Sequence, residues 1–342
     1  MSIDLSLDRV KILLAHLPTY DRPTIHIAGT NGKGSTSALV SSILHTGGLS
    51  VGRFNSPHLV SVRDSISLDG LPVDELDYAS AREEVMRADA EHGTHVTNFE
   101  LLTCTALYVF QRAQVDVAVL EVGLGGRLDA TNAIPDECVL VSALTAVDLD
   151  HQAFLGDTVE KIAKEKAAIA RKGRPFVLGP QKHGEVLSVV KDVLAQVGAD
   201  LVQAKTPAHR EWDQIIDGQY SRKQDQSFWE LPPQSITLEM SCFAAPLQAQ
   251  LPLPGEHQLD NLGTAIEIIN TLLTHPSCVR FTRSDIITPE IVVSGVKSTR
   301  WRGRLSFHKV PLDKLHLDKG RDLPSDGTLT VLADGAHNPA SA

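Results

Sequence analysis

Cysteine is scarce in this chain, which contains four in 342 residues. Cys104, Cys138, Cys242 and Cys278 form no C-x-x-C pair and have no histidine at zinc-ligand spacing, so we expect reduced structural thiols rather than a metal–thiolate site. The sequence also lacks the Ser/His/Asp and Cys/His patterns of enzymes that use a protein nucleophile. Long hydrophobic runs are missing too, because no apolar stretch approaches the roughly 20 residues of a membrane-spanning helix.

Positive charge is in deficit, since 32 lysines and arginines face 42 acidic residues and the formal net charge is −10. This excess argues against nonspecific binding of nucleic acid or of an anionic membrane, although a local basic pocket for phosphates remains compatible with it. The N-terminal stretch carries Asp4 and Asp8 where a leader would carry basic residues, and its apolar spacing fits an amphipathic helix of the fold. We therefore expect a soluble, cytoplasmic protein that binds neither nucleic acid nor a membrane.

The stretch from Thr24 to Ser42, TIHIAGTNGKGSTSALVSS, predicts a strand, a phosphate-binding loop and a helix. An apolar run breaks into a glycine-rich turn that carries Lys33, and a helix of small residues begins near Ser35. The glycines allow consecutive backbone N–H groups to point into one concavity, the helix start adds its positive dipole end, and the lysine supplies a charge for the β- and γ-phosphates. Ser35 or Thr36 could then reach Mg²⁺.

The spacing of this loop departs from the usual G-x-x-x-x-G-K-[ST] pattern. Only two residues separate Gly29 from Gly32, and Gly34 stands between Lys33 and Ser35. The alternative interpretation is an ordinary glycine-rich turn with Lys33 in solvent, but the strand, glycines, lysine and hydroxyls coincide in the order that phosphate binding requires.

Strand and helix patterns alternate along the rest of the chain. Helical patterns cover residues 74–91, a stretch that begins at Asn98, and residues 158–171, while VDVAVLEVGLGG and CVLVSALTAV read as strands buried on both faces. The alternation predicts an α/β fold with a mostly parallel sheet flanked by helices. Residues 206–235 are polar and read as an insertion or loop within a domain of residues 1–298, and residues 299–342 read as a linker and an incomplete second α/β domain whose strand covers residues 329–333.

Three residues at predicted strand ends are candidates for the site, because open α/β sheets bind ligands there. Glu121 lies in an otherwise apolar strand, where a carboxylate is costly unless it is paired or binds a metal. It could bind Mg²⁺, or it could form an ion pair with Arg127 or be a satisfied core acid. His151 and Ser56 lie in loops after strands, and each by itself is unremarkable.

Lys166 is a sharper anomaly. In the predicted helix TVEKIAKEKAAIAR it falls on the apolar stripe, whereas Lys161 and Lys164 fall elsewhere. A lysine on a core-facing stripe either extends its amine to the surface, meets a buried anion, or is chemically modified. The sequence alone leaves these three readings open.

Together these stretches resemble the folylpolyglutamate synthase/dihydrofolate synthase family, which is related to the Mur ligases. The matching words, in the family's order, are HIAGTNGKGS, SPHL, FELLTCTA, LEVGLGGRLDATN, LDHQAFLG, EKAAI, WRGR and DGAHNP. The wording looks closest to fungal-type dihydrofolate synthetases. Asn55 departs from the family by replacing the threonine that usually precedes the SPH serine, and Ala168 stands where glycine is common.

The resemblance implies a P-loop NTPase-like domain of the Mur ligase central type, followed by a Rossmann-like domain of which this sequence contains only the start. It also implies ATP and Mg²⁺ as cofactors. The implied ATP-binding residues are Gly32, Lys33, Gly34, Ser35, Asn261, Arg304, Asp334 and His337. The implied Mg²⁺ ligands, direct or through water, are Ser56, Glu121 and His151. The implied catalytic residues are Lys33, His151 and Lys166, the last as a carbamylated lysine, and the implied pterin-lining residues are Phe99, Glu100, Arg127, Asp129 and Ala130.

The chemistry implied by the resemblance is amide ligation by a monomer. The γ-phosphoryl group of ATP first activates a carboxylate as an acyl phosphate, and the amine of L-glutamate then displaces phosphate. The LDATN stretch favours 7,8-dihydropteroate as the acceptor. Alternatives are a synthase that adds glutamates to reduced folates, a nucleotide-binding chain that does not ligate, and a switch-type NTPase.

Overall fold

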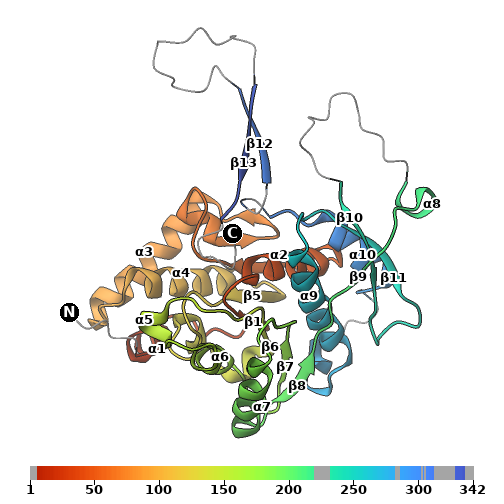
Figure 1. Cartoon of the computed structure of the whole chain (residues 1–342). Coiled ribbons are helices and arrows are strands. Elements are labelled where there is room, and N and C mark those ends of the chain that lie inside the picture. The colour runs from red at the N-terminus through yellow and green to blue at the C-terminus, as the bar shows by residue number, and fades with distance from the viewer. Residues whose placement is uncertain are drawn as a thin grey trace.

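The computed structural model describes residues 6–218, 232–281, 286–301, 303, 306–311 and 328–335. An eight-stranded sheet crosses the molecule in the order β4-β3-β2-β5-β1-β6-β7-β8 (Figure 1). Neighbouring strands pair in parallel along β2-β5-β1-β6-β7-β8, and β3 and β4 add an antiparallel edge beside β2. The bounds are β1 (Thr24–Ala28), β2 (Val51–Phe54), β3 (Ile66–Leu68), β4 (Leu71–Pro72), β5 (Val117–Glu121), β6 (Val139–Leu144), β7 (Pro175–Leu178) and β8 (Asp200–Gln203).

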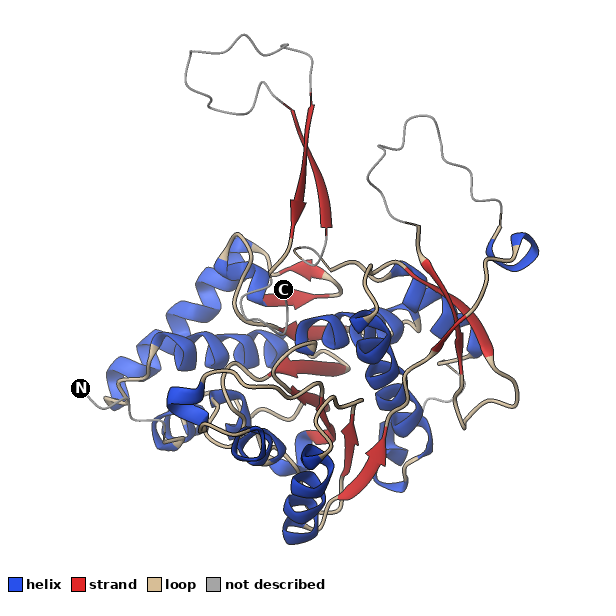
Figure 2. Ribbon diagram, in the orientation of Figure 1, coloured by secondary structure: helices blue, strands red, loops and turns tan. Residues whose placement is uncertain are grey.

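The central strands are buried along their whole length, as their apolar sequences predict. Every residue of β1, β5, β6 and β7 is buried. Strands of this kind need helices on both faces of the sheet, and Figure 2 shows helices on either side of it. The predicted α/β class with a mostly parallel sheet is therefore confirmed.

Each face of the sheet packs on its own set of helices. On one face lie α2 (Lys33–Thr46), α9 (His257–Thr274) and α10 (Pro289–Ser298), which share one apolar cluster with β1, β5 and β6. On the other face, α3 (Glu75–His92) and α4 (Asn98–Ala113) contribute to one cluster, and α6 (Val159–Ala167) and α7 (Glu185–Val197) form a second. The short helices are α1 (Asp8–Ala15), α5 (Gln152–Leu155) and α8 (Gln214–Asp217).

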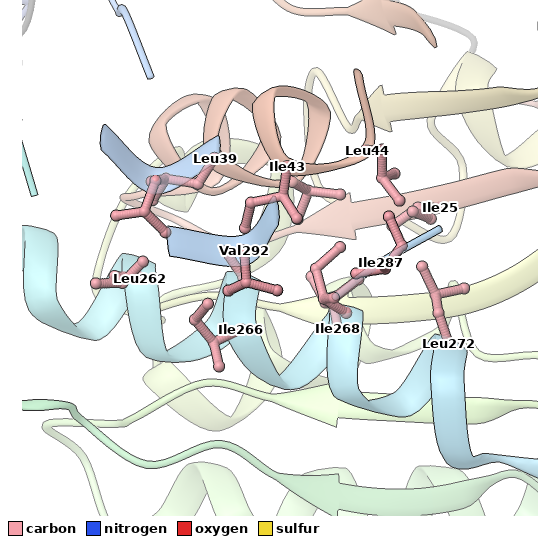
Figure 3. Packing of buried hydrophobic residues seen from close by; sticks show 14 of the residues in the cluster. Ile25, Leu39, Ile43, Leu44, Leu262, Ile266, Ile268, Leu272, Ile287 and Val292 are labelled. Carbon is pink, nitrogen blue, oxygen red and sulfur yellow. The ribbon is translucent and has the colours of Figure 1, made fainter. Parts of the chain in front are cut away.

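The largest of these three clusters includes α2, the helix that follows the glycine-rich turn. Figure 3 shows Leu39 and Ile43 of α2 facing Leu262 and Ile266 of α9, with Val292 of α10 among them. All five side chains are at most 4% exposed. Burying such residues contributes about 1.5–3 kcal/mol each, so this face fixes the position of α2 firmly.

Helix α10 approaches α2 closely through Gly295. The backbone oxygen of Gly295 accepts a hydrogen bond from Ser42 Oγ at 2.6 Å. A β-carbon on Gly295 would lie 2.5 Å from Ile43 Cα, so a side chain there would push the helices apart. This contact brings the end of α10 alongside α2.

The segment predicted as an insertion contains regular structure where it is described. A three-stranded antiparallel sheet joins β9 (Ala208–His209), β10 (Gln234–Leu238) and β11 (Leu247–Leu251) in the order β11-β10-β9. Apolar residues of β10 and β11 belong to the same cluster as α2 and α9. This small sheet therefore packs onto the main body.

The last described elements are β12 (Ser306–Pro311) and β13 (Thr328–Ala333), which pair antiparallel. The strand predicted over residues 329–333 is present, but its partner β12 was not predicted. Arg304 and His337 lie outside the described residues. Among the residues described, no helix combines the length and the apolar character needed to cross a membrane. All four cysteines are described, and none of them forms a disulfide.

Candidate functional site

The glycine-rich turn after β1 has a backbone that only glycine adopts easily. Gly32 has φ of +91°, and a β-carbon there would lie 2.0 Å from Asn261 Oδ1. Gly29 has φ of +152°, and a β-carbon there would lie 1.8 Å from Thr145 Oγ1. Helix α2 begins at Lys33, two residues before the predicted start near Ser35. Its first N–H groups, together with the turn, form the kind of helix start that binds phosphate.

The turn is held in place by the segment that follows β6. The backbone N–H groups of Thr30 and Asn31 donate to the oxygen of Ala146 at 2.8 and 3.3 Å. Thr145 Oγ1 donates to the oxygen of Asn31 at 2.7 Å, and Thr30 Oγ1 donates to the oxygen of Asp148 at 3.0 Å. The loop conformation therefore depends on two neighbouring strands, β1 and β6, rather than on its own sequence alone.

Lys33 folds back across the turn. Its Nζ donates to the backbone oxygens of Gly29 and Thr30, each at 3.1 Å, and lies 4.0 Å from Glu121 Oε1. The structure contradicts the alternative interpretation, in which this lysine extends into solvent. The ammonium group is held above the loop, where a phosphate could replace the carbonyl contacts.

Glu121 ends β5 in a buried polar cluster on the α2 face of the sheet. The residue is 5% exposed, and Asn55 Nδ2 donates to its Oε2 at 2.6 Å. The same amide donates to Ser37 Oγ on α2 at 2.7 Å. The alternative pairing of Glu121 with Arg127 is wrong, because Arg127 Nε lies 3.1 Å from Glu165.

Of the three candidate Mg²⁺ ligands, Ser56 lies in the loop after β2, Glu121 ends β5 and His151 lies in the loop after β6. In the sheet β5 and β6 flank β1, and β2 lies on the other side of β5. Ser56 directly follows Asn55, which contacts Glu121. His151 is half exposed, and its Nε2 lies 3.7 Å from Asp150 Oδ2, in the segment that Thr30 binds at Asp148. Because β2, β5, β1 and β6 are parallel, all three residues lie at the edge of the sheet where these strands end, which is also the edge of the glycine-rich turn.

The donor chemistry of this edge fits Mg²⁺ bound together with a phosphate. Within the described ranges, no group of three or more His, Cys, Asp or Glu residues could hold a metal ion by itself. Mg²⁺ differs from the metals of such groups, because it commonly keeps several waters and binds through one or two carboxylates plus substrate phosphates. A single buried carboxylate beside a phosphate loop is consistent with that mode of binding.

Lys166 reaches the same loop from the opposite face of the sheet. Its side chain is 3% exposed, and its Nζ donates to the oxygen of Gly29 at 2.9 Å. Burial, reinforced by the charge of Lys33, lowers the pKa of this amine to about 7, while Asp150 and Asp129 partly oppose the change. The amine neither reaches the surface nor meets a carboxylate at hydrogen-bond distance among the described contacts.

The lowered pKa of Lys166 predicts a pH-dependent stability. The ordinary lysine pKa of 10.5 applies to the unfolded chain, and the folded value is about 7. Between these values the unfolded state binds more protons, so the free energy of unfolding rises with pH. This stabilisation is complete above the unfolded value and is lost as the pH falls through the folded value. We expect Lys166→Met to flatten that rise in urea unfolding measured at several pH values.

The control for this measurement is Lys164→Met, on the exposed side of α6. It should leave the pH dependence of unfolding as in the unsubstituted chain. Buffers free of CO₂ keep the amine unmodified. An equal slope in the Lys166→Met and unsubstituted chains would contradict the assigned pKa.

The proposed pterin-lining residues divide into two kinds. Glu100 and Asp129 have their oxygens engaged by the protein itself. Glu100 forms a capping box with Thr97 at the start of α4 and accepts from Arg9 Nη2 at 3.2 Å. Asp129 is buried, and its carboxylate accepts from the N–H groups of Gly123, Leu124 and Thr131. Burial raises the pKa of Asp129 against those hydrogen bonds. Both acids hold the shape of their loops.

The other three members present apolar or cationic groups. Phe99 packs on Phe54, with ring centroids 6.1 Å apart, and closes against Gly123, where a β-carbon would lie 2.3 Å from its ring. Ala130 is buried and Arg127 is exposed beside Glu165. Phe99 and Arg127 thus border the loop that Asp129 organises.

Three residues beside the loop were missed by the sequence reasoning. Asn55 was noted only as a departure from the family, yet it joins Glu121 to α2. Arg53 and Trp301 were not considered, yet the guanidinium carbon of Arg53 lies 4.8 Å from the centroid of the Trp301 ring. A β-carbon on Gly34 would lie 2.7 Å from that ring. An arginine in the buried strand VGRF was the signal available in the sequence.

Of the four proposed nucleotide residues outside the glycine-rich turn and the start of α2, Asn261 and Asp334 are described. Asn261 is buried on α9 beside Gly32, and its Nδ2 donates to Gln258 Oε1 at 2.9 Å. Asp334 is exposed after β13, where the following Gly335 donates its N–H to the oxygen of Gly303 at 2.9 Å. Asn261 therefore lies against the loop, and Asp334 lies at the base of the strand pair.

Comparison with known proteins gives consistent matches over the whole chain. The profile of the Mur ligase middle domain matches residues 27–269. The dihydrofolate synthetase of Saccharomyces cerevisiae is 35% identical over 346 residues, covering all of this chain and 71% of that protein. The probable dihydrofolate synthetase of Schizosaccharomyces pombe is also 35% identical, with the same coverage. A solved structure described as an FPGS-AMPPCP-folate complex has a TM-score of 0.77 at 28% identity and covers all of this chain and 74% of its own.

Proposed function

The chain belongs to the Mur ligase family, in its dihydrofolate synthetase and folylpolyglutamate synthase branch, and from this premise we propose that it joins L-glutamate to 7,8-dihydropteroate at the expense of ATP. The product would be 7,8-dihydrofolate. The observation that carries the proposal is the phosphate loop, in which Lys33 lies over the turn and 4.0 Å from the buried Glu121. The names of the two yeast relatives support dihydropteroate as the acceptor.

In the proposed reaction, catalysis depends mainly on neutralising the negative charge of the phosphate groups. A carboxylate is a poor acyl donor, so ATP first transfers its γ-phosphoryl group to the acceptor carboxylate and leaves as ADP. The glutamate amine then attacks the acyl phosphate, and phosphate and a proton are released. The turn from Gly29 to Gly32, the first N–H groups of α2 and Lys33 would hold the phosphates in line with the acceptor.

Mg²⁺ would be held by Ser56, Glu121 and His151, directly or through water. When bound, it would offset negative charge on the phosphate oxygens. Asn55 orients the Glu121 carboxylate through its 2.6 Å hydrogen bond, so the oxygen nearer Lys33 faces the loop. His151 is half exposed and would contact the site from the loop after β6.

Lys166 is proposed to carry a carbamate. A neutral lysine amine adds CO₂ and releases one proton, and the pKa of about 7 leaves a substantial neutral fraction at physiological pH. The modification would exchange a buried cation beside Lys33 for an anion. Intact mass measurement under non-denaturing conditions would reveal the added CO₂, and its absence in the Lys166→Met chain would locate it.

The remaining assignments are proposals of the same kind. Gly32, Gly34, Ser35 and Asn261 would contact ATP from the described body, and Arg304, Asp334 and His337 from the C-terminal segment. Phe99, Glu100, Arg127, Asp129 and Ala130 would line or shape the pterin site. We propose that residues 1–298 form the ATP-binding unit, with residues 206–235 as an insertion, that residues 299–342 form a linker and part of a glutamate-ligase unit, and that the protein acts as a cytoplasmic monomer.

An acceptor assay tests the proposed function. The chain is supplied with ATP, Mg²⁺ and L-glutamate together with either dihydropteroate or tetrahydrofolate, and both phosphate release and the pterin product are measured. We expect dihydrofolate to form from dihydropteroate. Product from tetrahydrofolate alone would instead favour glutamate addition to reduced folates, a function supported by the likeness to the FPGS structures.

The controls of this assay distinguish a ligase from two further classes of protein. ADP binding without product in any mixture would identify a nucleotide-binding chain that does not ligate. Phosphate release that does not depend on the acceptor would identify a switch-type NTPase. Either result would contradict the ligase proposal.

A further inference from the structure

Arg53 is an unusual residue for its place in the sheet. It lies in β2, where Val51 joins the apolar cluster of the α2 face and Phe54 joins that of the α4 face. Because side chains alternate along a strand, Arg53 shares the α2 face with Val51. A β-carbon on Gly52 would meet Phe110 on the α4 face, which agrees with this alternation. A charged side chain therefore occupies a position that apolar residues fill elsewhere on that face.

The Arg53 side chain is partly buried, with its guanidinium over an aromatic ring and under the influence of a carboxylate. Its carbon lies 4.8 Å from the centroid of Trp301, and the charge of Glu121 favours its protonated form. Burial lowers the pKa of Arg53 to about 10, so it remains a cation at physiological pH. A desolvated cation over an indole ring is a favourable arrangement in a site of this kind.

Trp301 in turn rests on the phosphate loop. The atoms nearest to a β-carbon built on Gly34 belong to its ring, at 2.7, 3.1 and 3.2 Å. Gly34 therefore leaves the space that the indole fills. Among the described residues, Trp301 Nε1 and Arg53 Nε are buried without a hydrogen-bond partner, so packing and charge rather than hydrogen bonds hold these two groups.

Residues 299–301 and Gly303 lie against the start of α2 and the loop after β2. Thr299 is buried and donates its hydroxyl to the oxygen of Gly295, which ends α10 against α2. A β-carbon on Gly303 would lie 2.9 Å from Leu59, in the loop after Ser56. The oxygen of Gly303 accepts from the N–H of Gly335, at the end of β13.

We propose that Arg53 is a positioning residue that, by stacking on Trp301, holds Trp301 against Gly34 and so links the phosphate loop, through Gly303, to the strand pair β12–β13. Arg53 acts through Trp301 and Glu121 rather than on the reacting atoms. The inference rests on the proposed function only in naming the loop as the nucleotide site. The stack itself is a property of the free chain.

Hydrogen exchange of the free chain tests the link directly. Arg53→Met keeps the length of the side chain but removes the charge and the planar group. We expect the amides of residues 29–36 and of residues 296–303 to exchange about tenfold faster, the loss expected when a desolvated cation–π contact is removed. Combining Arg53→Met with Trp301→Leu should accelerate exchange by less than the product of the two single effects, because both changes break the contact between Arg53 and the indole.

The matched control is Arg63→Met. Arg63 lies in a neighbouring segment, where its Nη1 donates to the backbone oxygen of Val73 at 3.2 Å. Its loss should leave both exchange windows unchanged. Trp301→Phe, which retains an aromatic face, should also stay close to the unsubstituted chain, and Arg53→Lys should lie between it and Arg53→Met. If Arg53→Met does not unfold cooperatively, Trp301→Phe and Arg53→Lys provide the test of the contact instead.

A spectroscopic readout reports on the stack alone. The chain has three tryptophans, so replacing Trp212 and Trp229 with phenylalanine leaves Trp301 as the sole indole emitter. In that background Arg53→Met should shift the emission to the red and increase acrylamide quenching. Unchanged emission and exchange, or faster exchange confined to residues 296–303, would overturn the proposal.

Titration with ADP separates this inference from the proposed function. If the function holds, Arg53→Met should weaken ADP binding by about tenfold, and Arg63→Met should not. If the unsubstituted chain bound no ADP, the proposed function would be contradicted. The exchange and emission results would still decide whether Arg53 holds the segment to the loop.

Discussion

Replacing Lys33 with alanine is expected to lower the rate of ATP-dependent ligation by about a thousandfold or more, since electrostatic stabilisation by one well-placed donor accounts for factors of this size. Lys33 is the cation held over the turn, with its Nζ bonded to two loop oxygens and 4.0 Å from Glu121. Without it, the transferring phosphoryl group loses a positive charge at the loop. Steady-state phosphate release in the presence of dihydropteroate and glutamate measures the effect.

The same substitution should leave the fold nearly intact. The lysine lies at the start of α2, outside the apolar clusters, so we expect a loss of about 1–2 kcal/mol in the free energy of unfolding from its hydrogen bonds. Lys161→Ala is the control, because Lys161 is exposed and pairs with Asp157 at 2.7 Å. Near-normal turnover by Lys33→Ala would refute the assignment of the phosphate loop.

The second large effect is expected from Gly32→Ala, which should abolish measurable ADP binding. An alanine at φ of +91° is strained by roughly 1–2 kcal/mol. Its β-carbon would also lie 2.0 Å from Oδ1 of Asn261, whose Nδ2 donates a buried hydrogen bond to Gln258 Oε1. The loop must therefore shift away from α9, and its N–H groups lose their common direction. Isothermal titration with ADP measures the loss.

Gly48→Ala serves as a control that introduces backbone strain without a steric clash. Gly48 has φ of +84°, close to that of Gly32, but a β-carbon there meets no atom within 4 Å. This variant should lose a similar amount of stability through backbone strain and should bind ADP as the unsubstituted chain does. Equal ADP binding by both variants would show that the geometry of Gly32 does not govern the nucleotide site.

Much of the candidate site could be located from the sequence, because its residues lie at the ends of strands and its glycine-rich turn is a local pattern. The glycines and Lys33 lie within six residues of each other, so the strand, turn and helix that they form are local in sequence. The family resemblance and the parallel sheet are confirmed, and Lys166 is indeed buried on the stripe where the periodicity placed it. The start of α2 was misplaced by two residues, because Gly32 rather than Gly34 adopts the left-handed conformation that precedes the helix.

Some features could not be read from the chain, because they join residues far apart in it. From the sequence, Glu121 could bind Mg²⁺ or pair with Arg127. In the structure its carboxylate contacts Asn55 and lies 4.0 Å from Lys33, whereas Arg127 pairs with Glu165. The contact between Arg53 and Trp301 spans most of the chain. No local periodicity reports such a contact.

The sequence by itself determined the strand, glycine-rich turn and helix of the candidate site, the α/β class and the family, because each depends on short patterns whose physical basis is the backbone within a few residues. Tertiary structure alone decided which charges face one another at the loop. The lowered pKa of Lys166 and the stacking of Arg53 on Trp301 arise from packing of β1, β2, α6 and the segment after α10. Electrostatic energies depend on distance and desolvation in space, and neither quantity is encoded by proximity along the chain.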